Sequence, residues 1–158
     1  MTFVRPSIAA VVLMALSLCL QSGGMAALIA WARTGLGRDT HKLGRLGSAV
    51  LMVRFTTAII ALHVLQILVW ASFYRWLCFP FWESAFYFST ASYTTVGSSD
   101  VVLPPMWRTL GPVESVVGVL MCGLSASFLF AVVTRLVEHE VRRSGQRANP
   151  ALQSLARR

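Results

Sequence analysis

The sequence predicts an all-α membrane protein with three transmembrane helices and a short re-entrant helix that leads into a loop. The 158-residue chain is 56% hydrophobic and 13% charged, with a mean hydropathy of +0.65. Its long apolar runs match the length of about 20 residues that spans a bilayer and that soluble domains lack. Between two of these runs, the aromatic stretch 81–100 is too short and too polar at its end to cross. Irregular backbone at membrane depth is tolerated only where protein buries it or a water-filled path borders it.

The first apolar run lies in residues 1–31 and predicts an N-terminal transmembrane helix. A short basic start at Arg5 followed by an apolar stretch also fits a secretory signal peptide. The run continues past Gln21 for about a full bilayer thickness. We therefore favour a helix that stays in the membrane.

Basic residues flank the apolar runs and indicate the orientation of the chain. Residues 32–54 form a glycine-containing basic connector, and residues 138–158 a basic tail. Of the 14 Lys and Arg residues, five lie in the connector, six follow the third run, and three lie elsewhere (Arg5, Arg75 and Arg108). The positive-inside rule then places connector and C-terminus in the cytoplasm and the N-terminus outside. The net charge of +8 is explained by this flanking, so we expect membrane lipids, and no nucleic acid, as partners. The small size suggests a bacterial inner (plasma) membrane.

Residues 55–137 form the central unit of the predicted fold. It has a long helix at 55–75, a short one at 82–93 after Pro80, and a third at 112–134 that starts at Pro112.

The short helix is about 18 Å long, little more than half the hydrocarbon core. Its C-terminal end would point toward the membrane centre, where its partial negative charge favours a cation. Glu83 lies in its first turn, where a negative charge is favourable. We expect Phe86, Tyr87 and Phe88 to wedge this helix against the spanning helices. An alternative is a buried aromatic hairpin that conducts nothing.

The order Thr-Thr-Val-Gly-x-x-Asp at residues 94–100, behind an aromatic helix and ahead of a glycine-bearing apolar helix, resembles the pore module of potassium channels. The resemblance covers roughly 55–137, with 55–75 as outer helix, 82–93 as pore helix, 94–100 as selectivity filter and 112–134 as inner helix. It implies a passive homotetrameric channel whose permeant ion is K⁺ or Na⁺, with no other cofactor. No nucleophile–base set appears in the sequence, so we expect no enzymatic activity.

The resemblance also implies which residues touch the ion. The ion-binding residues would be Thr94, Thr95, Val96, Gly97 and Ser98, whose oxygens replace the hydration shell of the cation. Thr95, Val96 and Gly97 would hold the K⁺ ion most directly. This chain has Ser98-Ser99 where the family has Tyr-Gly. A left-handed backbone at Ser99 costs on the order of 1–2 kcal/mol. We therefore expect wider outer sites and weaker preference for K⁺ over Na⁺. The alternative is a non-conducting relative with a structural or regulatory role.

Further residues are expected to support the filter or move the inner helix. In the resemblance, Asp100 accepts a hydrogen bond from the pore helix, with Tyr87 as donor; a solvated acid that attracts cations is the other reading. Ser99 belongs to the same supporting set. Gly118 and Gly123 are the candidates for a gating hinge, although small residues also permit close helix packing.

His63 and Gln66 share a helix face inside an apolar run. An ionisable group in the membrane is a functional candidate. We favour a neutral His63 that is hydrogen-bonded to a neighbouring helix over a pH sensor.

Overall fold

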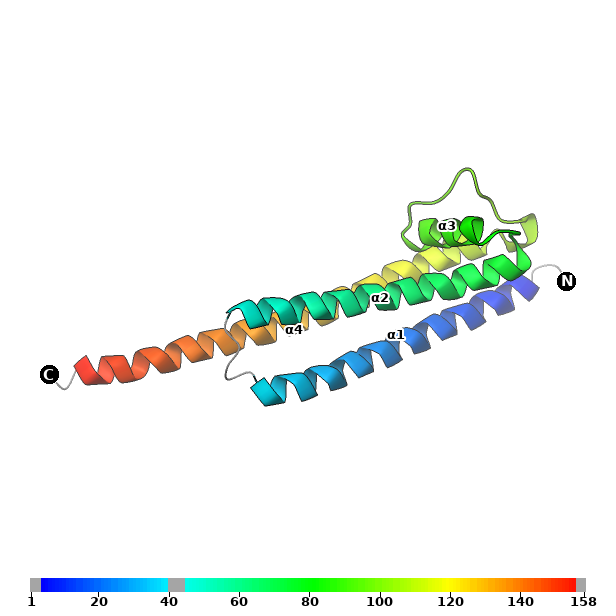
Figure 1. Cartoon of the computed structure of the whole chain (residues 1–158). Helices are drawn as coiled ribbons and strands as arrows, with labels where there is room; N and C mark the ends of the chain where they lie inside the picture. Colours follow the sequence, from blue (N-terminus) through cyan, green and yellow to red (C-terminus); the bar gives the residue numbers. More distant parts are fainter. Residues whose placement is uncertain (1–3, 40–44, 156–158) are drawn as a thin grey trace.

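The computed structural model describes residues 4–39 and 45–155, which form helices and connecting loops with no strand (Figure 1). The elements are α1 (Val4–Asp39), α2 (Arg45–Leu77), α3 (Trp82–Tyr93), the short 3₁₀ helix η1 (Pro105–Trp107) and α4 (Leu110–Leu155). In the described residues, three segments are long and apolar enough to cross a membrane: Val4–Trp31, Ala49–Leu77 and Pro105–Arg135. The predicted all-α fold with three long apolar helices is therefore confirmed.

The three long helices lie side by side, and α3 lies across α2 and α4 near one end of the bundle (Figure 1). The N-terminus of α1 lies at this same end, whereas the C-terminal part of α4 extends from the opposite end. At 12 residues, α3 is too short to cross a bilayer. The chain thus places a short helix and a loop at one end of a three-helix scaffold.

The helix boundaries agree with the sequence prediction at α3 and differ elsewhere. The short helix was expected at 82–93 and is found at Trp82–Tyr93. The described residues of the glycine-containing connector 32–54 are helical, because α1 continues to Asp39 and α2 begins at Arg45. A glycine in a helix costs only about 1 kcal/mol, so Gly35 and Gly37 do not end α1. The predicted tail 138–158 is likewise a continuation of α4 as far as Leu155.

Buried aromatic rings lie where α3 packs between α2 and α4. The ring of Phe88 meets that of Tyr74 edge-on at 5.2 Å and lies 5.7 Å from that of Phe79. Its neighbours Phe86 and Tyr87 are 41% and 47% exposed, so the expected three-residue wedge reduces to Phe88. The helical period explains this, since three successive residues cannot share one helix face.

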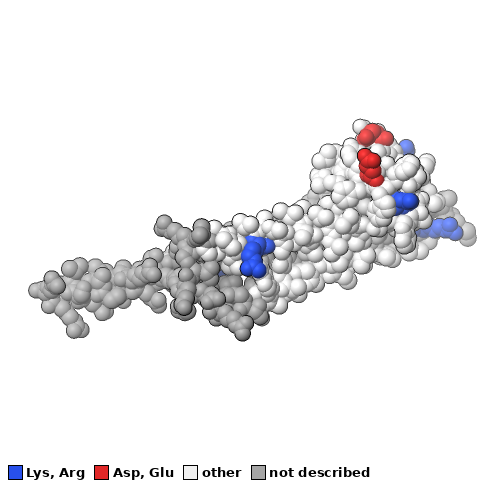
Figure 2. Space-filling view, viewed as in Figure 1, with Lys and Arg blue, Asp and Glu red and all other residues white. Residues whose placement is uncertain are grey.

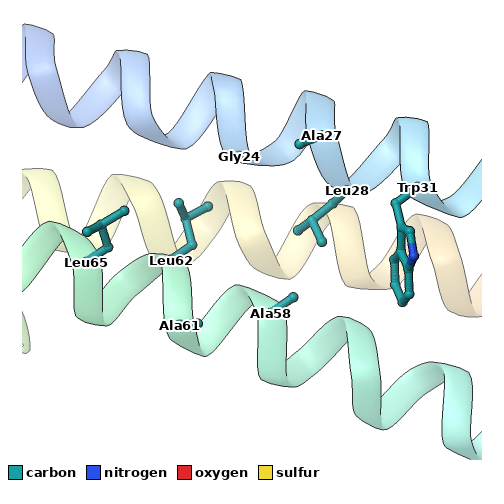
Figure 3. Close-up of a pocket in the computed structure, with 8 residues that line it drawn as sticks. All are labelled: Gly24, Ala27, Leu28, Trp31, Ala58, Ala61, Leu62 and Leu65. Carbon is teal, nitrogen blue, oxygen red and sulfur yellow. The ribbon is translucent and has the colours of Figure 1, made fainter.

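At the other end, aromatic rings join the three long helices. Phe55 of α2 is fully buried between Trp31 of α1 and Phe128 of α4, with ring centroids 5.1 and 6.0 Å apart. Above this cluster, α1 and α2 enclose an apolar groove whose lining includes Gly24 and Leu62 (Figure 3). A Cβ on Gly24 would lie 2.7 Å from both methyl carbons of Leu62. Gly24 therefore allows α1 to approach α2 closely.

Candidate functional site

The candidate site is the C-terminal end of α3 and the segment Thr94–Asp100 that follows it. The backbone of this segment turns back over the helix end. The N–H groups of Thr94, Thr95 and Gly97 donate to the carbonyl oxygens of Thr90, Ser92 and Ala91, at 3.0, 3.0 and 2.9 Å respectively. These bonds satisfy helix carbonyls that would otherwise lack an intrahelical partner, and they fix the start of the segment on α3.

Two residues of this segment have a left-handed backbone. Gly97 has a φ of 76°, and Thr95 has a φ of 64°. Gly97 adopts this conformation at little cost. Ser99 is not among the described residues with positive φ, which agrees with the expectation that a serine here does not adopt the left-handed backbone cheaply. The non-glycine residue that bears the cost is Thr95, for which a left-handed conformation amounts to about 1–2 kcal/mol.

The first part of the segment is exposed on the single chain. Thr94, Thr95, Val96 and Gly97 are all exposed, and 81% of the surface of Val96 is accessible. Within the described residues, no hydrogen bond ends on the carbonyl oxygens of Thr95, Val96 or Gly97. An exposed valine thus lies beside three carbonyl groups that have no described hydrogen-bond partner.

The second part of the segment folds on itself. Ser98 is half-buried, and its hydroxyl donates to the carbonyl oxygen of Val101. Ser99 and Asp100 are exposed. In the part of the chain that the structure describes, no hydrogen bond joins Asp100 to Tyr87, which lies on an exposed side of α3. Figure 2 shows acidic side chains over this end of the molecule, where Glu83 and Asp100 are the exposed acids.

Tyr93, the last residue of α3, is buried and belongs to a closed set of hydrogen bonds. Its hydroxyl donates to Oε1 of Gln66 at 3.2 Å and lies 2.8 Å from Nδ1 of His63. Gln66 donates to Gln21 of α1 at 2.7 Å, and Gln21 donates to Ser125 of α4 at 3.0 Å. The Ser125 hydroxyl lies 3.0 Å from Nε2 of His63, which closes the circle. His63 is thus hydrogen-bonded to neighbouring helices, as expected.

The two hinge candidates have different surroundings. A Cβ built on Gly118 would lie 2.0 Å from the carbonyl oxygen of Tyr93, whereas one on Gly123 would meet nothing within 4 Å. Gly118 therefore lets α4 pass against the end of α3, which is the packing role that small residues offer. The described α4 is one continuous helix through both glycines. A hinge at either residue stays a prediction.

Glu114, near the start of α4, is fully buried. It accepts a hydrogen bond from the hydroxyl of Tyr74 at 2.8 Å and one from Ser89 at 2.6 Å. Ser89 also lies 3.0 Å from the carbonyl oxygen of Ile67. One carboxyl group thus ties α4 to α2 and α3. The sequence held one indication of this inward position: Glu114 is four residues from Gly118, which places both on one helix face.

Fold and site together define a membrane protein in which two long apolar helices hold a short helix and an exposed loop between them. Residues 59–135 match a family model that is described as "Ion channel". The match covers α3, the Thr94–Asp100 segment and most of the two helices that hold them, and it supports an ion channel. Comparison with curated proteins and with solved structures gives no match.

Proposed function

We propose that the protein is a passive cation channel that conducts K⁺, with weak preference over Na⁺, through a pore formed by four copies of the chain. In this proposal, Thr94, Thr95, Val96, Gly97 and Ser98 of each copy face a common axis. Identical subunits usually assemble with closed symmetry, and the number four is what the resemblance to potassium channels implies. The family match at 59–135 supports the general class.

The proposal rests on the lack of described hydrogen-bond partners for the carbonyl groups of Thr95, Val96 and Gly97. They accept no hydrogen bond within the described residues, and they follow directly on a half-length helix. A cation that leaves water needs oxygens to replace its hydration shell. In a membrane, unpaired backbone groups are tolerated only beside protein or water. An axial water-filled path meets both requirements.

The orientation of the chain follows from its charges. We place the N-terminus outside and the C-terminus in the cytoplasm of a bacterial inner membrane, with α3 and its loop entering from the outer side. The N-terminus and α3 share one end of the bundle, so this placement puts both on the outer side. Gly118 and Gly123 stay candidates for the hinge of the inner gate.

The second candidate function is a non-conducting membrane partner with a structural or regulatory role. The turn closed by Ser98 and Val101 favours it, because a hydroxyl that folds the segment back on itself does not brace it from behind. In the conducting reading, the same turn widens the outer sites and lowers the preference for K⁺.

Flux through liposomes tests the proposal. Purified protein should release K⁺ and, more slowly, Na⁺ down their gradients, and Thr95→Ala should change the ratio of the two rates. Thr109→Ala, an exposed threonine after the segment, is the matched control and should leave both rates unchanged. Native mass spectrometry should show four copies. A well-folded protein that releases neither ion would contradict the channel and favour the non-conducting reading.

A further inference from the structure

Five buried or half-buried side chains form the closed set of hydrogen bonds, which we call the ring: Gln21, His63, Gln66, Tyr93 and Ser125. They come from α1, α2, α3 and α4, so the ring is the one set of polar contacts in the described residues that joins all four helices. The four members other than His63 are at most 4% exposed.

The hydrogen atoms in the ring can be assigned from the chemistry of its members. The one hydroxyl hydrogen of Tyr93 goes to Oε1 of Gln66, because a carbonyl oxygen cannot donate. Nδ1 of His63 must therefore donate to Tyr93. The amide nitrogen of Gln21 donates to Ser125, which leaves the serine hydrogen for Nε2 of His63. Every member then donates once and accepts once, and His63 is neutral with its proton on Nδ1.

Removing one member of the ring leaves its buried neighbours without hydrogen-bond partners, which destabilises the fold. A buried polar group without a partner loses on the order of 1–3 kcal/mol, and in a polar network that loss falls on the neighbours as well. If Gln21 is removed, Gln66 loses its acceptor and Ser125 its donor. Gln66 is linked to the hydroxyl of Tyr93 directly, and Ser125 is linked to it through His63.

Tyr93 is held at two points and directly precedes Thr94. Its hydroxyl lies in the ring, and its carbonyl oxygen lies against Gly118. The backbone of Thr94 and Thr95 continues from it and returns to α3 through hydrogen bonds. A shift of the Tyr93 side chain therefore moves the first residues of the Thr94–Asp100 segment.

We infer that Gln21 of α1 is a positioning residue for the ion-conducting segment, acting through the ring on Tyr93. The inference rests on the proposed function, and it gives α1 a role in ion selection. Gln21 lies outside the region 59–135 that matches the ion-channel model. The first helix thus supplies the member that closes a ring otherwise built by that region.

The chain offers a matched control. Ser17 of α1 accepts a hydrogen bond from Trp70 of α2 at 3.0 Å, and Ser17 is fully buried. Ser17→Ala removes an α1–α2 hydrogen bond of similar length without touching the ring. Gln21→Met keeps nearly the volume of the side chain and removes its hydrogen bonds. Tyr93→Phe removes the hydroxyl at the other side of the ring.

The experiment compares these variants in lipid bilayers by two readouts. In solid-state NMR, Gln21→Met and Tyr93→Phe should shift the backbone signals of Thr94 and Thr95, and Ser17→Ala should not. The ¹⁵N signals of His63 should report the Nδ1–H form in the parent protein. In bilayer recordings, Gln21→Met should change the K⁺/Na⁺ permeability ratio by about two- to fivefold. The double variant Gln21→Met/Tyr93→Phe should add little, because both changes break one ring.

The outcomes separate the two proposals. A parent protein that carries no current contradicts the proposed function, and the Thr94 and Thr95 signals still decide whether Gln21 positions the segment. Unchanged threonine signals in Gln21→Met, or equal effects of Gln21→Met and Ser17→Ala, would overturn the inference.

Discussion

Tyr93 and Val96 are three residues apart and have opposite surroundings. Tyr93 is buried, its hydroxyl has two partners, and its carbonyl oxygen lies against α4. Val96 is exposed, and no described hydrogen bond ends on its carbonyl oxygen. The chain itself therefore holds the start of the segment, whereas the described residues leave the part that follows exposed.

The largest expected effect comes from the contact between Gly118 and Tyr93. Gly118→Ala puts a Cβ 2.0 Å from a backbone carbonyl oxygen, which forces α3 and α4 apart. Overpacking of this kind costs about 1–3 kcal/mol, occasionally more, and it should abolish cation flux. Thermal unfolding in detergent and liposome flux measure the two effects.

The control is Gly123→Ala, where the added Cβ meets nothing within 4 Å. It should not lower stability. If Gly123→Ala alone alters flux at unchanged stability, Gly123 is the hinge. If Gly118→Ala is as stable and active as the parent, the supporting contact is not needed.

The next effect concerns Glu114. Glu114→Leu leaves the hydroxyls of Tyr74 and Ser89 without their acceptor, at about 1–3 kcal/mol for each buried group. We expect the midpoint of thermal unfolding to fall by several degrees, given about 2–4 °C per kcal/mol for a protein of this size. Glu114→Gln keeps an acceptor oxygen and should lose less. A Leu variant more stable than the parent would show that this buried contact does not support α3.

A smaller effect on ion selectivity is expected from the exposed part of the Thr94–Asp100 segment. Ser98→Tyr/Ser99→Gly installs the residues of the potassium-channel filter and removes the hydroxyl that folds back to Val101. The K⁺/Na⁺ permeability ratio should rise by roughly tenfold, equivalent to about 1.4 kcal/mol. Bilayer reversal potentials measure it. An unchanged ratio would mean that Ser-Ser does not limit selectivity.

The smallest effect is on the reactivity of Cys78, which lies between α2 and α3. Burial raises the pKa of its thiol from about 9 to about 11. The thiolate is the reactive form, so little is present at pH 8 and more appears as the pH rises toward 11. In a Cys19→Ser/Cys122→Ser background, maleimide labelling should be slow at pH 8 and accelerate over this range. Fast labelling at pH 8 would show that the Cys78 thiol is not buried.

Much of the fold follows from local sequence signals. Run length predicts the three long helices, and Pro80 together with the change to Thr-Thr-Val-Gly predicts both ends of α3. These signals act within a few residues. They did not predict the extension of α1 to Asp39. Gly35 and Gly37 suggested an irregular connector, but a glycine destabilises a helix by only about 1 kcal/mol, which is too little to end it.

The support of the segment could not be predicted in the same way. Gln21 and Ser125 are 104 positions apart, and no spacing rule links residues on different helices. The meaning of Gly118 depends on a carbonyl oxygen of Tyr93, which the sequence does not place. The location of the left-handed residues also depends on how the segment returns to α3, which explains why strain falls at Thr95 and not at Ser99.

The most direct test asks whether a permeating ion meets Thr95. A Thr95→Cys variant in a background without Cys19, Cys78 and Cys122 is reconstituted in planar bilayers, and Ag⁺, a monovalent cation that binds thiols, is added. We predict a K⁺ current in both the variant and its cysteine-free parent, with Ag⁺ blocking the variant alone. A K⁺ current that Ag⁺ leaves unchanged in Thr95→Cys would place the ion path away from this segment and contradict the account.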